Sequence, residues 1–183
     1  MRVRPTVTLG AAFIALALLS VLPAPSPDGG VRAADPATNA QRKGSGLPIP
    51  RFASLKSDEV NVRTGPGPRY PVDWVFKRKL MPVEIVAEYE NWRKIRDWQG
   101  ASGWVYQGLL TGKRSFIIST HAANLYKTPA AQADVVAKLE PAVMGEIRSC
   151  QGDWCRIRVA GPGVNGWIQR TEIWGVYKSE PIN

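Results

Sequence analysis

The chain is short and basic, and it is rich in turn-forming and aromatic residues. Its 183 residues exclude more than two small domains, and 24 basic against 15 acidic residues give a formal net charge of +9, which favours anionic partners. Seven Trp, 17 Gly and 15 Pro residues suit compact β-structure with many turns.

The N-terminus predicts export. Two arginines stand among the first four residues, and the run Val7–Leu22 is apolar. That run is short for a membrane span, which needs roughly 20 apolar residues. Val31 and Ala33 fit the −3 and −1 positions of a cleavage site, so we interpret residues 1–33 as a signal peptide cut after Ala33. The alternative is an uncleaved N-terminal anchor.

Export sets the expected surroundings and partners. The predicted location is the periplasm or cell envelope, where wall polymers and lipid headgroups supply negative charge, and a nucleic-acid partner is not expected. Membrane contact is expected only through an uncleaved signal or weak binding to anionic lipid. Residues 34–50 are polar and rich in Pro and Gly, which predicts a disordered linker that becomes extended at Leu47–Pro50.

The rest of the chain is an internal repeat. Three short motifs recur 62 or 63 residues later, and a constant offset across three anchors indicates duplication. We therefore expect one domain over residues 51–114 and a second over 115–183. The paired motifs are Asn61–Thr64 with Asn124–Lys127, Trp92–Arg96 with Trp154–Arg158, and Gly103–Val105 with Gly166–Ile168.

Each repeat is expected to be all-β. In the first, Val60–Thr64 predicts a strand, and Gly65–Pro68 an irregular loop. Val83–Tyr89 alternates apolar and polar residues with period two, which is typical of a half-buried strand. Turns then lead to strands over Trp92–Trp98 and Gly103–Tyr106. Five or six strands in about 60 residues predict a small barrel that closes its own edges.

At these residues the chain resembles the bacterial SH3 family. The resemblance implies two tandem small SH3-like β-barrels, and it implies export and peptidoglycan binding, because many members sit beside wall hydrolases. It covers both repeats, although the second departs at Tyr126 and Lys127 and lacks the Gly-Pro-Gly run. The matching residues of repeat one are Asn61–Pro66, Val83–Ile85, Asn91–Ile95 and Gly103–Val105.

The only two cysteines, Cys150 and Cys155, are predicted to form a disulfide, because disulfides form and persist in exported chains. Gly152 and Asp153 fit a two-residue type II′ turn, which places the cysteines opposite each other at a non-hydrogen-bonded pair. So short a loop predicts about 2 kcal/mol of stabilisation. The alternatives are a redox-active pair or half of a metal site.

The equivalent positions of repeat one hold opposite charges. Glu88 and Arg93 replace the two cysteines there, and we expect an exposed ion pair worth about 0.2–1 kcal/mol.

No set of residues suggests catalysis. The chain has a single histidine, His121, and no nucleophile, Walker or metalloprotease motif. Glu84, Glu88 and Glu90 are interpreted as a solvated face. We therefore expect neither enzymatic activity, nor a cofactor, nor a metal site.

The predicted ligand site lies in repeat one. Residues 51–114 carry 12 basic and 7 acidic residues, whereas 115–183 carry 7 and 6. Basic and aromatic side chains together could form a groove that suits sugar rings or peptide stems. In SH3 folds the groove contains a Trp at the start of one strand. Trp92 or Trp154 matches this Trp, although either could equally be core. The predicted contacts are Tyr70, Trp74, Lys77, Arg78, Lys79, Trp92, Arg93, Arg96, Trp104 and Tyr106.

The predicted function is non-catalytic binding of peptidoglycan or another anionic envelope polymer, with a cell-wall glycan or peptide as the partner. The alternative is a scaffold that binds another envelope protein, which an exposed apolar patch on repeat two would favour.

Overall fold

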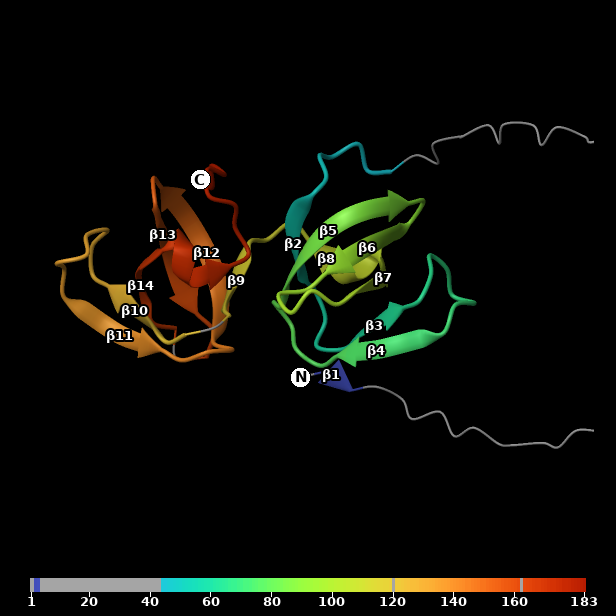
Figure 1. Cartoon of the computed structure of the whole chain (residues 1–183), viewed down its shortest axis with the longest axis horizontal. Helices are drawn as coiled ribbons and strands as arrows, with labels where there is room; N and C mark the ends of the chain where they lie inside the picture. The colour runs from blue at the N-terminus through green and yellow to red at the C-terminus, as the bar shows by residue number, and fades with distance from the viewer. Residues whose placement is uncertain (1, 4–43, 120, 162) are drawn as a thin grey trace, which may run out of the picture. The chain divides into compact units, whose positions relative to one another are not determined.

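The structure is a computed structural model that describes residues 2–3, 44–119, 121–161 and 163–183 (Figure 1). The predicted cleavage site and most of the predicted linker lie outside these residues. Within them the secondary structure is β-strand with two short 3₁₀ turns, so the expected all-β class is confirmed. No helix in this described part is both long and apolar enough to cross a membrane.

Repeat one, residues 51–114, forms one antiparallel sheet. Its strand order is β4-β3-β7-β6-β5-β2-β8, and β1 (Arg2–Val3) pairs with the outer side of β4. The elements are β2 (Arg51–Leu55), β3 (Val60–Arg63), β4 (Val72–Phe76), β5 (Pro82–Tyr89), β6 (Trp92–Arg96), β7 (Ser102–Tyr106), η1 (Gln107–Leu109) and β8 (Leu110–Thr111).

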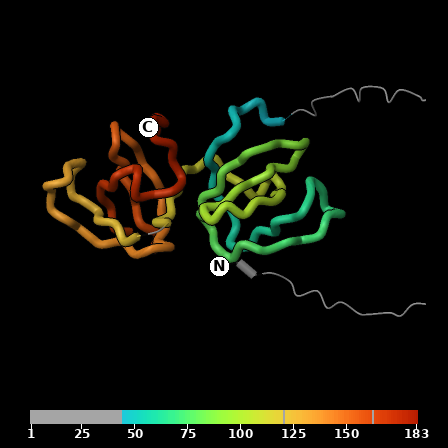
Figure 2. Tube along the Cα trace, in the orientation of Figure 1, coloured from blue at the N-terminus to red at the C-terminus, as the bar shows by residue number. Residues whose placement is uncertain are grey.

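Repeat two, residues 115–183, has the same topology. Its order is β11-β10-β14-β13-β12-β9-β15, in which every strand is the seventh after its counterpart in repeat one. Figure 2 shows the path of the chain through both repeats. The elements are β9 (Ser115–Ile118), β10 (Ala123–Tyr126), β11 (Val135–Leu139), β12 (Met144–Gln151), β13 (Trp154–Val159), β14 (Asn165–Gln169), η2 (Arg170–Glu172) and β15 (Ile173–Trp174).

Strand β9 joins the two hydrophobic cores. All four of its residues are buried, because successive side chains of a strand point to opposite faces and both faces are covered. Phe116 and Ile118 pack in the core of repeat two, whereas Ile117 packs in the core of repeat one. Both repeats accordingly fall within one compact unit.

Strand β5 corrects the predicted alternation. The period-two pattern holds as far as Ile85, where the register against β6 shifts and leaves Val86 as an extra residue. Beyond this bulge the two faces exchange. Glu88 lies opposite the buried Arg93, and Tyr89 lies opposite the partly exposed Trp92.

The predicted disulfide between Cys150 and Cys155 is confirmed. The two residues are direct cross-strand partners in the β12–β13 hairpin, with a Cα–Cα distance of 4.0 Å. Gly152 has φ 52°, as the first central position of the predicted turn requires. The amide N–H of Cys150 donates to the carbonyl of Ile182 (2.8 Å), so it points away from β13, as a non-hydrogen-bonded pair demands.

Candidate functional site

Three aromatic side chains form a row across β5, β6 and β7, which lie side by side in Figure 1. Trp92 is the cross-strand partner of both Tyr89 and Tyr106. The rings of Trp92 and Tyr106 meet edge to face, with centroids 5.8 Å apart. Tyr106 is 44% exposed. The neighbouring residues along β6 and β7, Arg93 and Val105, are buried and point inward. The row therefore lies on the outer face of the sheet.

A second row adds a cation to the aromatic residues. Lys94 is the cross-strand partner of Trp104, and Arg63 pairs with Trp104 from the other side. The guanidinium of Arg63 donates to the carbonyl of Tyr70 (2.7 Å), which fixes the loop between β3 and β4 beside this face.

That loop closes one end of the face. Its residues Pro66–Tyr70 border a hollow of about 440 Å³ whose other wall is Tyr89, Glu90 and Trp92. Gly65 is required here, since a Cβ at this position would lie 2.3 Å from the ring of Tyr70. We call the set Tyr70, Tyr89, Trp92, Lys94, Trp104 and Tyr106 the aromatic face.

The aromatic face contains four of the ten predicted contacts: Tyr70, Trp92, Trp104 and Tyr106. Tyr89 was missed because the β5 bulge, which turns it outward, leaves no mark in the residue pattern. Lys94 belongs to the basic surplus of repeat one but was not among the predicted contacts.

Two predicted contacts are corrected because their side chains are buried. Trp74 is 2% exposed and packs in the core of repeat one. Arg93 is 4% exposed, and its guanidinium donates to the carbonyls of Glu90 and Trp92 and to the side chain of Gln107. Trp74 therefore cannot present its side chain to a ligand, and the guanidinium of Arg93 is already occupied by hydrogen bonds within the domain.

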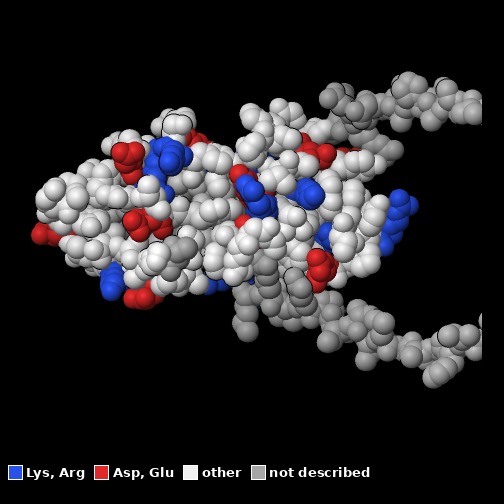
Figure 3. Space-filling view, in the orientation of Figure 1, with Lys and Arg blue, Asp and Glu red and all other residues white. Residues whose placement is uncertain are grey.

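The remaining predicted cations lie elsewhere. Lys77, Arg78 and Lys79 follow β4, where Lys77 pairs with Glu59 (2.5 Å) and Arg78 donates to the carbonyl of Ala142. Arg96, on β6, donates two hydrogen bonds to Glu84. Figure 3 shows basic and acidic side chains next to one another at several places on the surface.

Glu88 is not the solvated carboxylate that was expected. Its side chain is 8% exposed and lies between Arg93 (3.1 Å) and Arg51 (2.5 Å), while Ser45 donates to it through both its amide and its hydroxyl. Burial alone would raise the pKa of Glu88, but the hydrogen bonds from Arg51 and Ser45 outweigh it and lower the pKa to about 2.

These contacts involve the last part of the predicted linker, the only part of it that the structure describes. From Ser45 onward the chain is hydrogen-bonded to repeat one, and Arg51 donates to the carbonyl of Pro48. Ser45 and Pro48 therefore attach this exposed segment to repeat one by hydrogen bonds.

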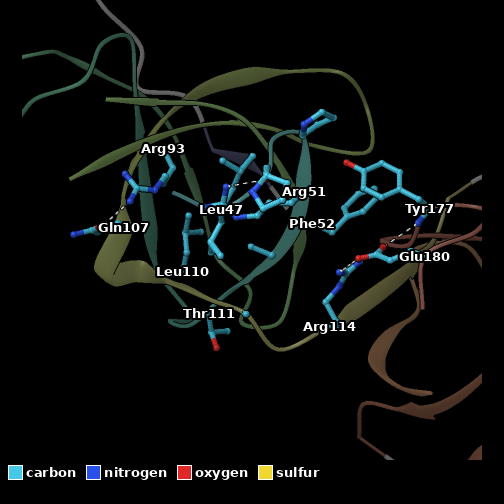
Figure 4. Close-up of a pocket in the computed structure, with 15 residues that line it drawn as sticks. Leu47, Arg51, Phe52, Arg93, Gln107, Leu110, Thr111, Arg114, Tyr177 and Glu180 are labelled. Carbon is cyan, nitrogen blue, oxygen red and sulfur yellow. Dashed lines mark hydrogen bonds and ion pairs between the residues drawn. The ribbon is translucent and has the colours of Figure 1, made fainter. Parts of the chain in front are cut away.

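A larger hollow, of about 570 Å³, lies beside this docked segment (Figure 4). Leu47, Phe52 and Leu110 line it, and its cations are already paired, since Arg51 and Arg93 contact Glu88 and Arg114 contacts Glu180. Burial alone would raise the pKa of Glu180, but the hydrogen bond and the charge of Arg114 outweigh burial and lower this pKa. The Arg114–Glu180 pair therefore stays charged. The hollow thus offers mainly apolar contact and no unpaired positive charge among these residues.

Among the described residues, no three His, Cys, Asp or Glu side chains are grouped so that they could hold an ion. What the site offers is aromatic surface and a cation.

Comparison with known proteins places this architecture. The sequence profile described as "Bacterial SH3 domain" matches residues 56–112 and again 119–175. The chain belongs to the bacterial SH3 domain family. Both copies of the bacterial SH3 domain contain the predicted repeat motifs, so the tandem arrangement is confirmed.

No curated protein matches the chain. Among solved structures, this bacterial SH3 protein is similar to "Structure of NlpC1 from Trichomonas vaginalis", at 19% identity and a TM-score of 0.30, over 76% of this chain and 50% of that one. It is also similar to "Structure of NlpC2 from Trichomonas vaginalis", at 17% identity and a TM-score of 0.31, over 73% and 51%. The chain spans about half the length of these structures.

Proposed function

We propose that this protein is an exported, non-catalytic binding module of the cell envelope whose aromatic face takes peptidoglycan or another anionic envelope polymer. The observation that carries the proposal is the outward row Tyr89–Trp92–Tyr106 with Lys94 beside it. Aromatic rings offer wide, rigid contact to sugar rings, and the lysine supplies charge for carboxylate or phosphate. Membership of the bacterial SH3 family supports a wall-binding role.

The test is sedimentation of the exported chain with purified peptidoglycan at low and high salt. Trp92→Ala is expected to weaken binding by about twofold to tenfold at both salt concentrations, because aromatic contact contributes about 0.5–1.5 kcal/mol and is not screened. Lys94→Ser is expected to weaken binding only at low salt, because exposed charges are screened beyond about 10 Å at 0.1 M. Lys77→Ser, which removes an exposed cation outside the face, is the matched control and should bind nearly as wild type.

Wild-type binding by both Trp92→Ala and Lys94→Ser, with circular dichroism unchanged, would refute the aromatic face as the site. The non-catalytic part has its own readout: peptidoglycan incubated with the protein should release no more soluble fragments than the buffer blank. Export is tested by mass spectrometry of envelope fractions, which should find an N-terminus near Ala34.

A scaffold is the second candidate, and one observation favours it. Val135 and Val136 are 52% and 48% exposed on β11, which is the last strand of its sheet. Adjacent exposed valines at a sheet edge suit contact with another protein. On this alternative, replacing both valines with serine should abolish capture of an envelope protein, whereas Trp92→Ala should leave that capture intact.

A further inference from the structure

Repeat two carries the central residues of the aromatic face at equivalent positions. Trp154 and Trp167 stand where repeat one has Trp92 and Trp104, and Arg156 stands where it has Lys94. The pairing is the same as well, since Arg156 is the cross-strand partner of Trp167 just as Lys94 is of Trp104.

These residues lie on the outer face of β13 and β14. They alternate along the strands with Cys155, Ile157 and Ile168, which are fully buried, whereas Trp154 and Trp167 are partly exposed and Arg156 is exposed. Tyr126 of β10 extends the surface, with its ring perpendicular to that of Trp154 at a centroid distance of 5.4 Å. None of these three rings belongs to the hydrophobic core of repeat two.

The neighbours of this surface differ from those in repeat one. Gln151 and Gln169 replace Tyr89 and Tyr106, so amide groups flank the tryptophans and can both donate to and accept from hydroxyl groups. The loop over 128–132 is exposed throughout, whereas Gly65 and Gly67 of the Gly-Pro loop in repeat one are buried. The surface is therefore more open, and fewer rings are available to hold a ligand.

We propose that Tyr126, Trp154, Arg156 and Trp167 form a second site for anionic glycan, which makes the chain bivalent. This inference rests on the function proposed for repeat one. A polymer with repeating units can engage both sites at once, and linked sites raise the overall affinity by about 10²–10⁴ without any new contact. The second site alone is expected to be the weaker of the two.

Isothermal titration with soluble disaccharide-peptide fragments of peptidoglycan, each too short to reach two sites, counts the sites in the full chain. The expected stoichiometry is two fragments per wild-type chain. Trp92→Ala should weaken one of these two sites by about twofold to tenfold, and Trp154→Ala should weaken the other to a similar extent. Arg156→Ser changes an exposed side chain, so the fold is kept, and it should weaken the second site several-fold at low salt. Lys178→Ser is the control for loss of an exposed charge in repeat two, and it should leave both sites intact.

The outcomes separate the two proposals. A stoichiometry of one, at a site that Trp92→Ala weakens and that Trp154→Ala and Arg156→Ser leave unchanged, overturns the second site while the function of repeat one stands. A single site that Trp154→Ala weakens and Trp92→Ala leaves unchanged supports the site in repeat two and overturns that in repeat one. Absence of any fragment or polymer binding by wild-type chain overturns both.

Discussion

Glu88 stands between two arginines at a position where the sequence indicated only a surface ion pair. Because the side chains of Glu88 and Arg93 are 8% and 5% exposed, removing the carboxylate leaves a buried guanidinium without its counter-charge. We predict that Glu88→Gln lowers the free energy of unfolding by about 3 kcal/mol at neutral pH. Urea denaturation measures this loss. Glu59→Gln, which breaks the exposed pair with Lys77, is the control and should lose less than about 1 kcal/mol.

The same carboxylate predicts a pH dependence. The pKa of Glu88 falls from an ordinary 4.5 to about 2 on folding, so its contribution is complete above pH 4.5 and disappears as the pH falls to about 2. The stability difference between wild type and Glu88→Gln should therefore shrink across this acid range. A difference that stays constant from pH 7 to pH 2 would contradict the assignment of the low pKa to Glu88.

At the scale of the strand, a glycine sets the approach of β3 to β7. A Cβ on Gly103 would lie 2.4 Å from the side chain of Val62 and 3.0 Å from the carbonyl of Arg63. We predict that Gly103→Ala destabilises repeat one by about 1–3 kcal/mol, since well-packed cores resist added volume. Gly112→Ala is the control, because a Cβ there meets nothing within 4 Å. Equal thermal midpoints for the two variants would contradict this packing.

The hairpin of repeat two predicts a separate element-scale effect. The Cys150–Cys155 bridge closes a short loop, so its reduction should lower stability by about 2 kcal/mol without unfolding the chain. Thiol titration of unreduced protein from the native compartment should give no free thiol, and two reactive thiols there would contradict the bridge. A Cys150→Ser, Cys155→Ser double variant should match the reduced wild type in urea.

Strands were predictable from sequence where one face of the strand is buried. The direction of the side chains was not predictable beyond the point where the register shifts. The motif around Trp92, the turn at Gly152 and the disulfide all follow from local alternation. The bulge at Val86 does not, because a bulge inserts a residue without changing composition, and it reversed the expected faces of Glu88 and Tyr89. Four of the predicted site residues belong to the aromatic face. The outward direction of Tyr89 could not be predicted from the sequence pattern.

At the scale of the whole molecule, aromatic and polar contacts join the two repeats. The ring of Phe52 meets those of Trp174 and Tyr177 at centroid distances of 4.8 and 4.7 Å, and the Tyr177 hydroxyl donates to Glu84 (2.8 Å). Tyr177 lies beyond the three motifs that recur at a constant offset, so the repeat pattern did not indicate this contact. Because β9 contributes residues to both cores and these rings join the repeats, we predict that both repeats unfold in one cooperative transition.

Tyr177 makes this junction sensitive to alkali. Burial raises the pKa of its phenol, and the hydrogen bond to the Glu84 carboxylate raises it further. A raised pKa in the folded state means that stability is complete below the unfolded pKa of about 10 and is lost as the pH rises above it. We predict that Tyr177→Phe costs about 1.5–3 kcal/mol at pH 7, as expected for a hydrogen bond to a charged acceptor.

Because the phenylalanine variant cannot ionise at this position, its stability curve should approach that of wild type as the pH rises above 10. Urea denaturation from pH 7 to pH 11 measures both curves, and subtracting one from the other removes the contribution of lysines common to both. Tyr106→Phe is the control: this ring is 44% exposed on the aromatic face, so the variant should run parallel to wild type. Parallel curves for Tyr177→Phe and wild type would instead mean that the phenol of Tyr177 is not held protonated by Glu84 in the folded chain.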